Sequence, residues 1–262
     1  MTTRDRSVWA SASPAPAVLR AGAILDLLAR ARGRALSPAQ LAAGAGGIPR
    51  ASVVNVCAAL SESELVRATD GGFVLGPGVL RLSQAYLDSM DPVREFREQV
   101  TRLPDRAATL QLATLDGSDV VYLAVHEGTT VLRLTSKAGT RLPSTSTALG
   151  KAMLAGMSDA EVRELLADRE PFEALTPWSV RTLDVLLEEL RTARERGYAV
   201  DDQETSEGVL CVAVAVPGLP DPGQRFAVSS SVLKSQATPE RVAALTELIS
   251  GVVRRLGGAE AR

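Results

Sequence analysis

Few side chains in this 262-residue sequence have the chemistry of a nucleophile, a general base or a metal ligand. The single histidine, His126, follows Tyr122 in a segment with the pattern of a strand end, and we interpret it as a partly buried polar residue. The two cysteines, Cys57 and Cys211, are far apart and form no CxxC pair. Zinc sites need three or four closely spaced ligands, and a Ser-His-Asp or Cys-His centre would depend on His126 alone. We therefore predict no metal site, no cofactor and no enzymatic activity.

Polar residues of a second kind lie on the helix that we predict from Pro49 to Ser63. One side of this helix is apolar and would face a core, because its residues recur at i, i+3, i+4 and i+7: Val53, Val56, Cys57 and Leu60. The candidate DNA contacts lie on the opposite side and in the strand that follows: Arg50, Ser52, Val54, Asn55 and Arg67. Asparagine can pair with adenine through two hydrogen bonds, while serine and arginine reach phosphates or base edges. A solvated face on a small helical subdomain is the alternative.

The neighbouring elements decide between these two interpretations. Residues 1–16 are rich in Ser, Ala and Pro and are expected to be a disordered arm. A helix is predicted from Ala17 to about Arg30, and Ser37-Pro38 has the pattern of an N-cap and the first residue of a short second helix. After the helix at 49–63, a hairpin turns at Asp70-Gly71-Gly72. This order of helices, turn and two-stranded wing predicts a DNA-binding winged helix-turn-helix over residues 17–76.

The rest of the chain has a different pattern, in which strands alternate with helices. Linker helices are predicted over residues 77–103, and a second domain over residues 104–257. The predicted strands are 107–115, 119–125, 131–136, 198–200, 209–216 and 225–232, and the predicted helices are 148–156, 158–166, 182–196 and one that starts at 238–240. Groups of strands separated by helices predict an α+β fold with a central antiparallel sheet.

A hydroxyl-rich loop from Ser144 to Thr147 leads into the helix predicted at 148–156. A helix N-terminus offers unpaired backbone N–H groups and favours anions, and Ser229 and Ser231 are two residues apart, so they point to one face of a strand. Either these groups form a polar binding site, or Thr147 is only an N-cap and the serines lie on a wet sheet face. Because Gly150-Lys151 lacks the first glycine of a P-loop, Lys151 is expected to be a local charge or part of a surface pair.

Charge is divided unevenly along the chain, whose formal net charge is −2. Residues 1–90 contain nine arginines, no lysine and six acidic residues, a net charge of +3, which leaves −5 for the remainder. This asymmetry fits a DNA-contacting module joined to one that makes no DNA contact. No apolar run approaches the roughly 18–20 residues of a membrane span. The N-terminus also lacks the apolar segment of a signal peptide, so we expect a cytoplasmic protein.

Four stretches of the sequence form a recognisable set of motifs. Two lie in the N-terminal half: Ala23-Ile24-Leu25-Asp26-Leu27-Leu28 and Gly72-Phe73-Val74-Leu75-Gly76. Two lie in the C-terminal half: Arg141-Leu142-Pro143 with residues 147–155 (TALGKAMLA), and residues 197–204 (GYAVDDQE) with residues 208–211 (GVLC). With these motifs in this order and spacing, the sequence resembles the IclR family of bacterial transcription regulators over about residues 17–257.

The resemblance implies a ligand-responsive regulator whose C-terminal, GAF-like domain binds a small molecule. By position it assigns to the effector the backbone N–H groups of Ala148 and Leu149 and four side chains: Asp201, Cys211, Ser229 and Ser231. These side chains are of the types seen in family members that bind small carboxylates. The resemblance also implies a homodimer through the N-terminal domains, often a homotetramer through the C-terminal ones, on double-stranded operator DNA.

Two residues depart from the family pattern, and other functions stay open. Asn55 stands where Arg is common, which points to a distinct operator sequence, and Glu64 stands where Gly is common, which is expected to change only a turn. One alternative is a GAF-domain enzyme or redox sensor that uses Cys211, which would need a lowered thiol pKa and usually a resolving cysteine. Another is an adaptor that uses the winged helix for protein contacts.

Overall fold

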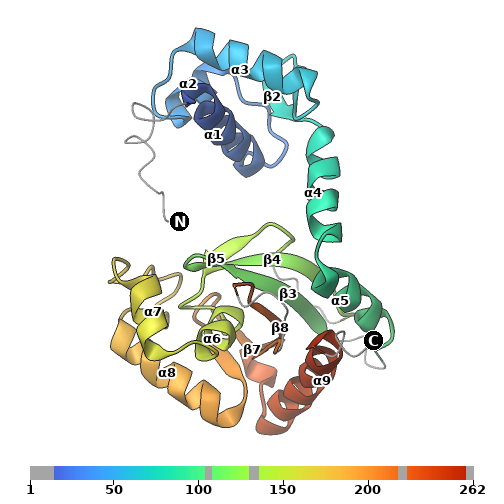
Figure 1. Cartoon of the computed structure of the whole chain (residues 1–262), viewed down its shortest axis with the longest axis vertical. Coiled ribbons are helices and arrows are strands. Elements are labelled where there is room, and N and C mark those ends of the chain that lie inside the picture. The colour runs from blue at the N-terminus through green and yellow to red at the C-terminus, as the bar shows by residue number, and fades with distance from the viewer. Residues whose placement is uncertain (1–14, 104–107, 130–135, 218–222, 258–262) are drawn as a thin grey trace. The chain divides into compact units, whose positions relative to one another are not determined.

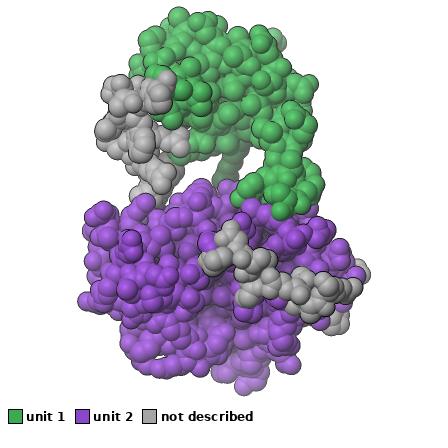
Figure 2. All heavy atoms as spheres, viewed as in Figure 1, with its two compact units in different colours: residues 1–89 green, residues 90–262 purple. Residues whose placement is uncertain are grey.

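A computed structural model of the protein describes residues 15–103, 108–129, 136–217 and 223–257 (Figure 1). The chain forms two compact units, residues 1–89 and residues 90–262 (Figure 2). The two helices predicted as a linker lie one in each unit: α4, Gly78–Asp88, in the first and α5, Asp91–Thr101, in the second. Of the predicted arm, residues 1–14 lie outside the described residues, and the first helix already begins at Pro16.

The first unit is a helix-turn-helix with a two-stranded wing, as the sequence predicts. Its elements are α1 (Pro16–Arg30), α2 (Pro38–Gly44), α3 (Arg50–Glu62), β1 (Val66–Thr69), β2 (Gly72–Leu75) and α4. Ser37 caps α2 in a capping box with Gln40, which is why the short helix starts there. The three helices and the wing enclose one apolar core: Ile24, Leu28, Leu36, Leu41, Ala42, Val53, Cys57 and Val66.

The turn after α3 forms around Glu64, which adopts a left-handed conformation with φ of 58°. The backbone N–H of Leu65 donates to the carbonyl of Leu60 at 2.9 Å, the bond that closes a Schellman motif. The turn was expected to change, but the chain keeps the turn that glycine would make, with a residue that has a Cβ atom.

We expect the substitution Glu64→Gly to raise the free energy of unfolding by about 0.5–1 kcal/mol. The left-handed conformation costs a residue with a Cβ atom roughly 1–2 kcal/mol, part of which is offset because glycine gives up about 0.5–1 kcal/mol more backbone entropy on folding. Urea unfolding measures the change. Ala59→Gly, at an exposed position inside α3, is the matched control and should instead destabilise by about 1 kcal/mol. A loss of stability in Glu64→Gly would contradict the conclusion that the left-handed conformation of Glu64 is strained.

The second unit is built on a six-stranded sheet in which every neighbouring pair is antiparallel, in the order β5-β4-β3-β8-β7-β6. The strands are β3 (Thr109–Asp116), β4 (Asp119–His126), β5 (Arg141–Pro143), β6 (Ala199–Asp202), β7 (Val209–Ala215) and β8 (Phe226–Leu233). The α+β prediction with a central antiparallel sheet is confirmed. The short edge strand β5 was not predicted, and residues 131–135 of the strand predicted at 131–136 lie outside the described residues.

Helices cover the sheet, and small side chains set how closely one of them approaches. Helix α6 (Ala148–Ala155) packs on the sheet through alanines on both sides, including Ala152, Ala213 and Ala227. Helices α7 (Asp159–Leu166) and α8 (Leu183–Arg196) enclose a second cluster around Leu154. Helix α9 (Pro239–Gly257) packs on β7, β8 and α5 (Figure 1). A single three-residue 3-10 turn, Lys234–Gln236, precedes it.

Candidate functional site

The candidate DNA contacts occupy the exposed side of α3 and the adjoining wing. Val53 and Cys57 are fully buried and hold α3 against the core, which leaves Arg50, Val54 and Asn55 exposed. Because 3.6 residues make one turn, Asn55 lies on the side opposite this buried pair, whereas Arg50, one turn before Val53, and Val54 lie nearer the buried side. The fifth predicted contact, Arg67, is exposed on β1.

Ser52 differs from its neighbours on α3 because it is half-buried and has a partner. Its hydroxyl oxygen accepts a hydrogen bond from Nη1 of Arg20, in α1, at 3.0 Å. The Nε atom of Arg20 is buried and has no hydrogen-bond partner. Sequence reasoning missed Arg20, since nothing in an arginine on an amphipathic helix shows that it reaches a second helix 32 positions further along the chain.

The four predicted effector side chains lie together on one face of the sheet. Asp201 on β6 is opposite Cys211 on β7, which is opposite Ser231 on β8. Ser229, two residues before Ser231, belongs to the adjacent row of the same face, because side chains alternate along a strand. Three consecutive strands, β6, β7 and β8, therefore bring these polar groups together.

These polar groups already have partners within the sheet. The Sγ atom of Cys211 is 3.1 Å from Oγ of Ser231, and the hydroxyl of Ser229 donates to Oε1 of Gln111 at 2.7 Å. Gln111, on β3, is almost fully buried and was not singled out in the sequence. Tyr122, on β4, belongs to the same buried cluster as Cys211 and was also missed. Both are separated by long stretches of chain from the motifs that marked the site.

The predicted hydroxyl-rich loop lies directly against the start of α6. Thr147 is the N-cap, and its Oγ1 atom accepts a hydrogen bond from the backbone N–H of Gly150 at 2.9 Å. A Cβ atom at Gly150 would lie 2.2 Å from the carbonyl oxygen of Ser144, so only glycine allows this close approach. The hydroxyls of three further residues are buried without a hydrogen-bond partner: Ser144, Thr145 and Ser146. Buried hydroxyls usually have a hydrogen-bond partner, and these three find none among the described residues, so they are polar groups that a ligand could bind.

Burial raises the pKa of three ionisable groups of this site. Burial raises the pKa of the Cys211 thiol well above its ordinary value, and the nearby Asp201 carboxyl raises it further. Burial likewise raises the pKa of Tyr122 and that of Asp201. For Asp201 this rise is opposed by three hydrogen-bond donors: Oγ1 of Thr205, the backbone N–H of Glu204 at 2.7 Å and that of Thr205 at 3.2 Å.

Lys151 does not form the surface pair expected from the sequence. It is 1% exposed, and its Nζ atom donates to Oε2 of Glu189 at 2.5 Å, to Oε1 of Glu204 and to the carbonyl of Val200 at 3.4 Å. The expectation was wrong because Lys151 faces α8 and the sheet rather than solvent. The carboxylates that compensate its charge come from elements 38 and 53 positions away.

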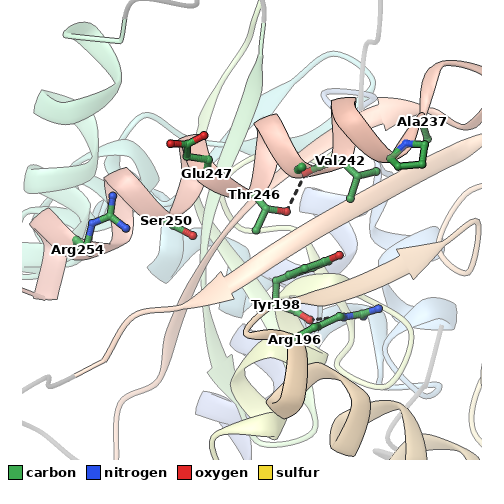
Figure 3. Close-up of a pocket in the computed structure, with 10 residues that line it drawn as sticks. Arg196, Tyr198, Ala237, Val242, Thr246, Glu247, Ser250 and Arg254 are labelled. Atoms are coloured by element: carbon green, nitrogen blue, oxygen red, sulfur yellow. Dashed lines mark hydrogen bonds between the residues drawn. The ribbon is translucent and has the colours of Figure 1, made fainter.

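A groove of about 680 Å³ lies elsewhere in the second unit, beside α9 (Figure 3). It is lined by residues 196, 198, 237, 239, 242, 243, 246, 247, 250 and 254. Arg196 stacks over the ring of Tyr198 at 4.7 Å and donates to its carbonyl, and Glu247 lies along the same groove. None of the predicted effector residues lines it, so it is separate from the polar site on the sheet.

Two findings concern only the described part of the chain. There, no group of three or more His, Cys, Asp or Glu side chains could hold a metal ion. No helix of these residues is both long and apolar enough to cross a membrane. His126 lies at the end of β4, is half-buried, and its Nε2 atom has no hydrogen-bond partner.

Both units match known families. Residues 17–70 match the family described as "IclR helix-turn-helix domain", and residues 84–256 match "Bacterial transcriptional regulator IclR C-terminal". The chain is 33% identical over 148 residues to the HTH-type transcriptional regulator XynR of Escherichia coli (strain K12). The matched segment covers 56% of this chain and 58% of that protein. It is 32% identical over 173 residues to the Pca regulon regulatory protein of Pseudomonas putida, 64% of this chain and 58% of that protein. The chain thus spans less than two thirds of the length of these curated relatives.

Solved structures resemble the chain over nearly all of its length. The Agobacterium tumefaciens repressor BlcR is 30% identical with a TM-score of 0.58, covering 93% of this chain and 98% of that one. A regulator from Alicyclobacillus acidocaldarius is 22% identical with a TM-score of 0.80, covering 92% and 97%. An IclR homologue from Microbacterium hydrocarbonoxydans, complexed with 4-hydroxybenzoate, is 20% identical with a TM-score of 0.73, covering 92% and 98%. The last two likenesses are of fold alone.

Proposed function

The chain belongs to the IclR family of bacterial transcription regulators, and on that premise we propose that it is a DNA-binding regulator controlled by a small carboxylate. Effector binding is supported mainly by the polar site in the second unit. There, three partnerless buried hydroxyls and a helix N-terminus lie close to a sheet face that bears Asp201, Cys211, Ser229 and Ser231. DNA binding is supported by the exposed side of α3, beside the wing.

For DNA binding, we assign the DNA contacts to five residues of α3 and the wing: Arg50, Ser52, Val54, Asn55 and Arg67. The buried pair Val53 and Cys57 fixes which side of α3 is presented. Ser52 would contact DNA together with Arg20, because the two side chains are already hydrogen-bonded. Binding should weaken steeply with salt as arginines neutralise phosphates and displace counterions.

For the effector, we assign the carboxylate to the start of α6, near the backbone N–H groups of Ala148 and Leu149. Helix N-termini favour anions, and the hydroxyls of the preceding loop add donors. The carboxyl group of Asp201, when ionised, accepts and would face a hydrogen-bond donor on the same molecule. An acid that also carries a hydroxyl group satisfies both ends, and 4-hydroxybenzoate, bound in the Microbacterium homologue, has this chemistry.

The regulator is proposed to act as a homodimer through its N-terminal units, with a homotetramer as the larger form. Apolar side chains that are unusually exposed in unit one support a protein–protein surface there: Val18 (69%), Leu19 (41%), Leu80 (74%), Leu82 (51%) and Tyr86 (53%). A two-fold dimer would present two α3 helices to a palindromic operator, and would also double the positive charge of the DNA-contacting unit.

A thiol enzyme or redox sensor is the less favoured function. The thiolate is the reactive form of cysteine, and burial raises the pKa of Cys57 to about 11 and that of Cys211 further still. Cys57 is also fully buried in the core of unit one, where it is not available to resolve an oxidised Cys211. We therefore assign Cys211 a role in lining the effector site and propose no catalytic activity.

A thermal-shift screen of small acids, beginning with 4-hydroxybenzoate, tests the sensing half. A cognate acid at about 100 times its dissociation constant should stabilise the protein by about 2.7 kcal/mol, since it binds the folded chain alone. The matching amides, which lack the negative charge, serve as controls and should give little shift. A screen in which amides stabilise and acids do not would remove the carboxylate from the proposal.

A further inference from the structure

Lys151 is a fully buried cation that the proposed function does not use. An isolated ammonium group in a protein interior is strongly unfavourable, so its partners have to be part of the fold. Those partners are Glu189, from α8, and Glu204, from the turn that follows β6. Glu189 is about two-fifths exposed, whereas Glu204 is nearly as buried as the lysine. The pair formed by Lys151 and Glu204 is thus the internal one.

Glu204 is the centre of the turn that holds the Asp201 carboxyl group. Its side chain contacts Lys151, its backbone N–H donates to Oδ1 of Asp201 at 2.7 Å, and its carbonyl accepts from the hydroxyl of Ser179 at 2.6 Å. The next residue, Thr205, donates to Asp201 through both its backbone N–H and its hydroxyl. Any shift of Glu204 would therefore also move Asp201.

The same turn contains a conformation that needs support. Gln203, which precedes Glu204, is in the left-handed region with φ of 67°. A residue with a Cβ atom persists there only when the surrounding contacts hold it in place. The hydrogen bond from the backbone N–H of Gln203 to the carbonyl of Val209 at 2.9 Å fixes one side of the turn, and the pair of Lys151 with Glu204 fixes the other.

Lys151 also lies in the helix that forms the other half of the effector site. Its backbone N–H bonds to the carbonyl of the N-cap Thr147 at 3.0 Å, so it is one turn away from the residues assigned to the carboxylate. We propose that Lys151 is a positioning residue of the effector site, which holds Asp201 in register with the start of α6 through Glu204. This inference rests on the proposed function, because it concerns the same site.

The charges around Glu204 show why a cation is needed there. The pKa of Glu204 is raised to about 7, chiefly by burial; Lys151 opposes this rise, and the carboxyl groups of Glu189 and Asp201 add to it. Its Oε2 atom is buried and has no hydrogen-bond partner. Without Lys151, three acidic groups from α8, β6 and the turn would face one another with no positive charge between them. The turn would then open and separate the two halves of the effector site.

The reactivity of Cys211 reports on this geometry without any ligand, because Cys211 is paired with Asp201 across β6 and β7. Full-length wild type, Lys151→Met and Glu204→Gln are treated with iodoacetamide, and mass spectrometry follows the peptides of Cys211 and Cys57 separately. We expect both variants to alkylate Cys211 roughly tenfold faster, the factor for local opening that is about 1.4 kcal/mol easier. Cys57, in the core of the other unit, should keep its wild-type rate.

Two further variants separate positioning from general loss of stability. Val162→Ala removes buried volume from the cluster between α7 and α8 and lowers stability in the same unit without touching the turn. It should leave the Cys211 rate near that of wild type. Lys151→Arg keeps the positive charge and should bring the rate most of the way back from that of Lys151→Met. An unchanged Cys211 rate in Lys151→Met, or an equal acceleration in Val162→Ala, would overturn the proposal.

A binding experiment distinguishes a failure of this inference from a failure of the proposed function. Calorimetric titration with 4-hydroxybenzoate should show weaker binding to Lys151→Met than to wild type, and an intermediate affinity for Lys151→Arg. Equal affinity for wild type and Lys151→Met would overturn the positioning role. If wild type does not bind this acid, the failure counts against the carboxylate in the proposed function, while the alkylation rates still decide the role of Lys151.

Discussion

Asp201→Ala should abolish the response to the effector while operator binding in its absence stays within about twofold of wild type. Asp201 is 2% exposed, and its carboxyl group is the acceptor on β6 around which the turn at 201–205 is organised. Truncation removes both the acceptor that we assign to the effector and the acceptor for the N–H and O–H groups of the turn. Losing a charged hydrogen-bond partner in a buried site costs about 1.5–3 kcal/mol or more, enough to weaken effector binding at least tenfold.

The neighbouring aspartate supplies a matched control for this prediction. Asp202 points to the opposite face of β6, where its carboxylate pairs with Nζ of Lys234 at 2.5 Å in a partly exposed salt bridge. Asp202→Ala should leave the effector response intact, because exposed pairs contribute little. The measurement is operator binding, by fluorescence anisotropy, with and without the stabilising acid found by thermal shift. A normal response in Asp201→Ala would place the effector elsewhere.

Asn55→Ala should weaken binding to the operator by about 1–3 kcal/mol, a factor of roughly 5–150 in dissociation constant, if its side chain makes a bidentate base contact. Asn55 is exposed on α3, one turn beyond the helix start and on the side opposite Val53 and Cys57. Its position makes it the best placed hydrogen-bonding side chain on this surface to read a base edge. Footprinting on the promoter and anisotropy on the protected fragment measure the effect.

The control for the Asn55 prediction uses variants of the operator DNA. Replacement of single base pairs within the protected half-site should identify one position at which wild type discriminates and Asn55→Ala does not. Binding to unrelated DNA should be the same for both proteins, because phosphate contacts supply nonspecific affinity. Identical footprints and affinities for the two proteins would show that Asn55 takes no part in base reading.

Much of the fold follows from local patterns that the sequence already contains. The i, i+3, i+4 spacing on α3, the Ser37 and Ser158 capping boxes and the short apolar runs of the strands depend on residues a few positions apart. Such patterns act locally, so they predicted the winged helix-turn-helix and the antiparallel sheet. The three-residue strand β5 was missed, because it is too short to show a period.

The candidate effector residues were assigned by family resemblance, and the sequence alone gave only Ser229, Ser231 and the hydroxyl-rich loop as polar groups. The tertiary structure decided which side chains contact these residues. The partners of Cys211 and Ser229 include Ser231 and Gln111, and Gln111 lies 118 positions from Ser229. Sheet register brings such residues together, and no local pattern encodes it.

Lys151 shows most clearly which properties follow from the sequence and which depend on the tertiary structure. From the sequence it was a lysine near the start of a helix, and lysines in that setting are usually exposed. Which side of α6 faces the interior depends on how α6 packs against the sheet and α8, and that packing also supplies Glu189 and Glu204 as partners. The sequence by itself determined the helix and the charge, whereas the burial and the ion pairs depend on contacts between distant elements that only the folded chain makes.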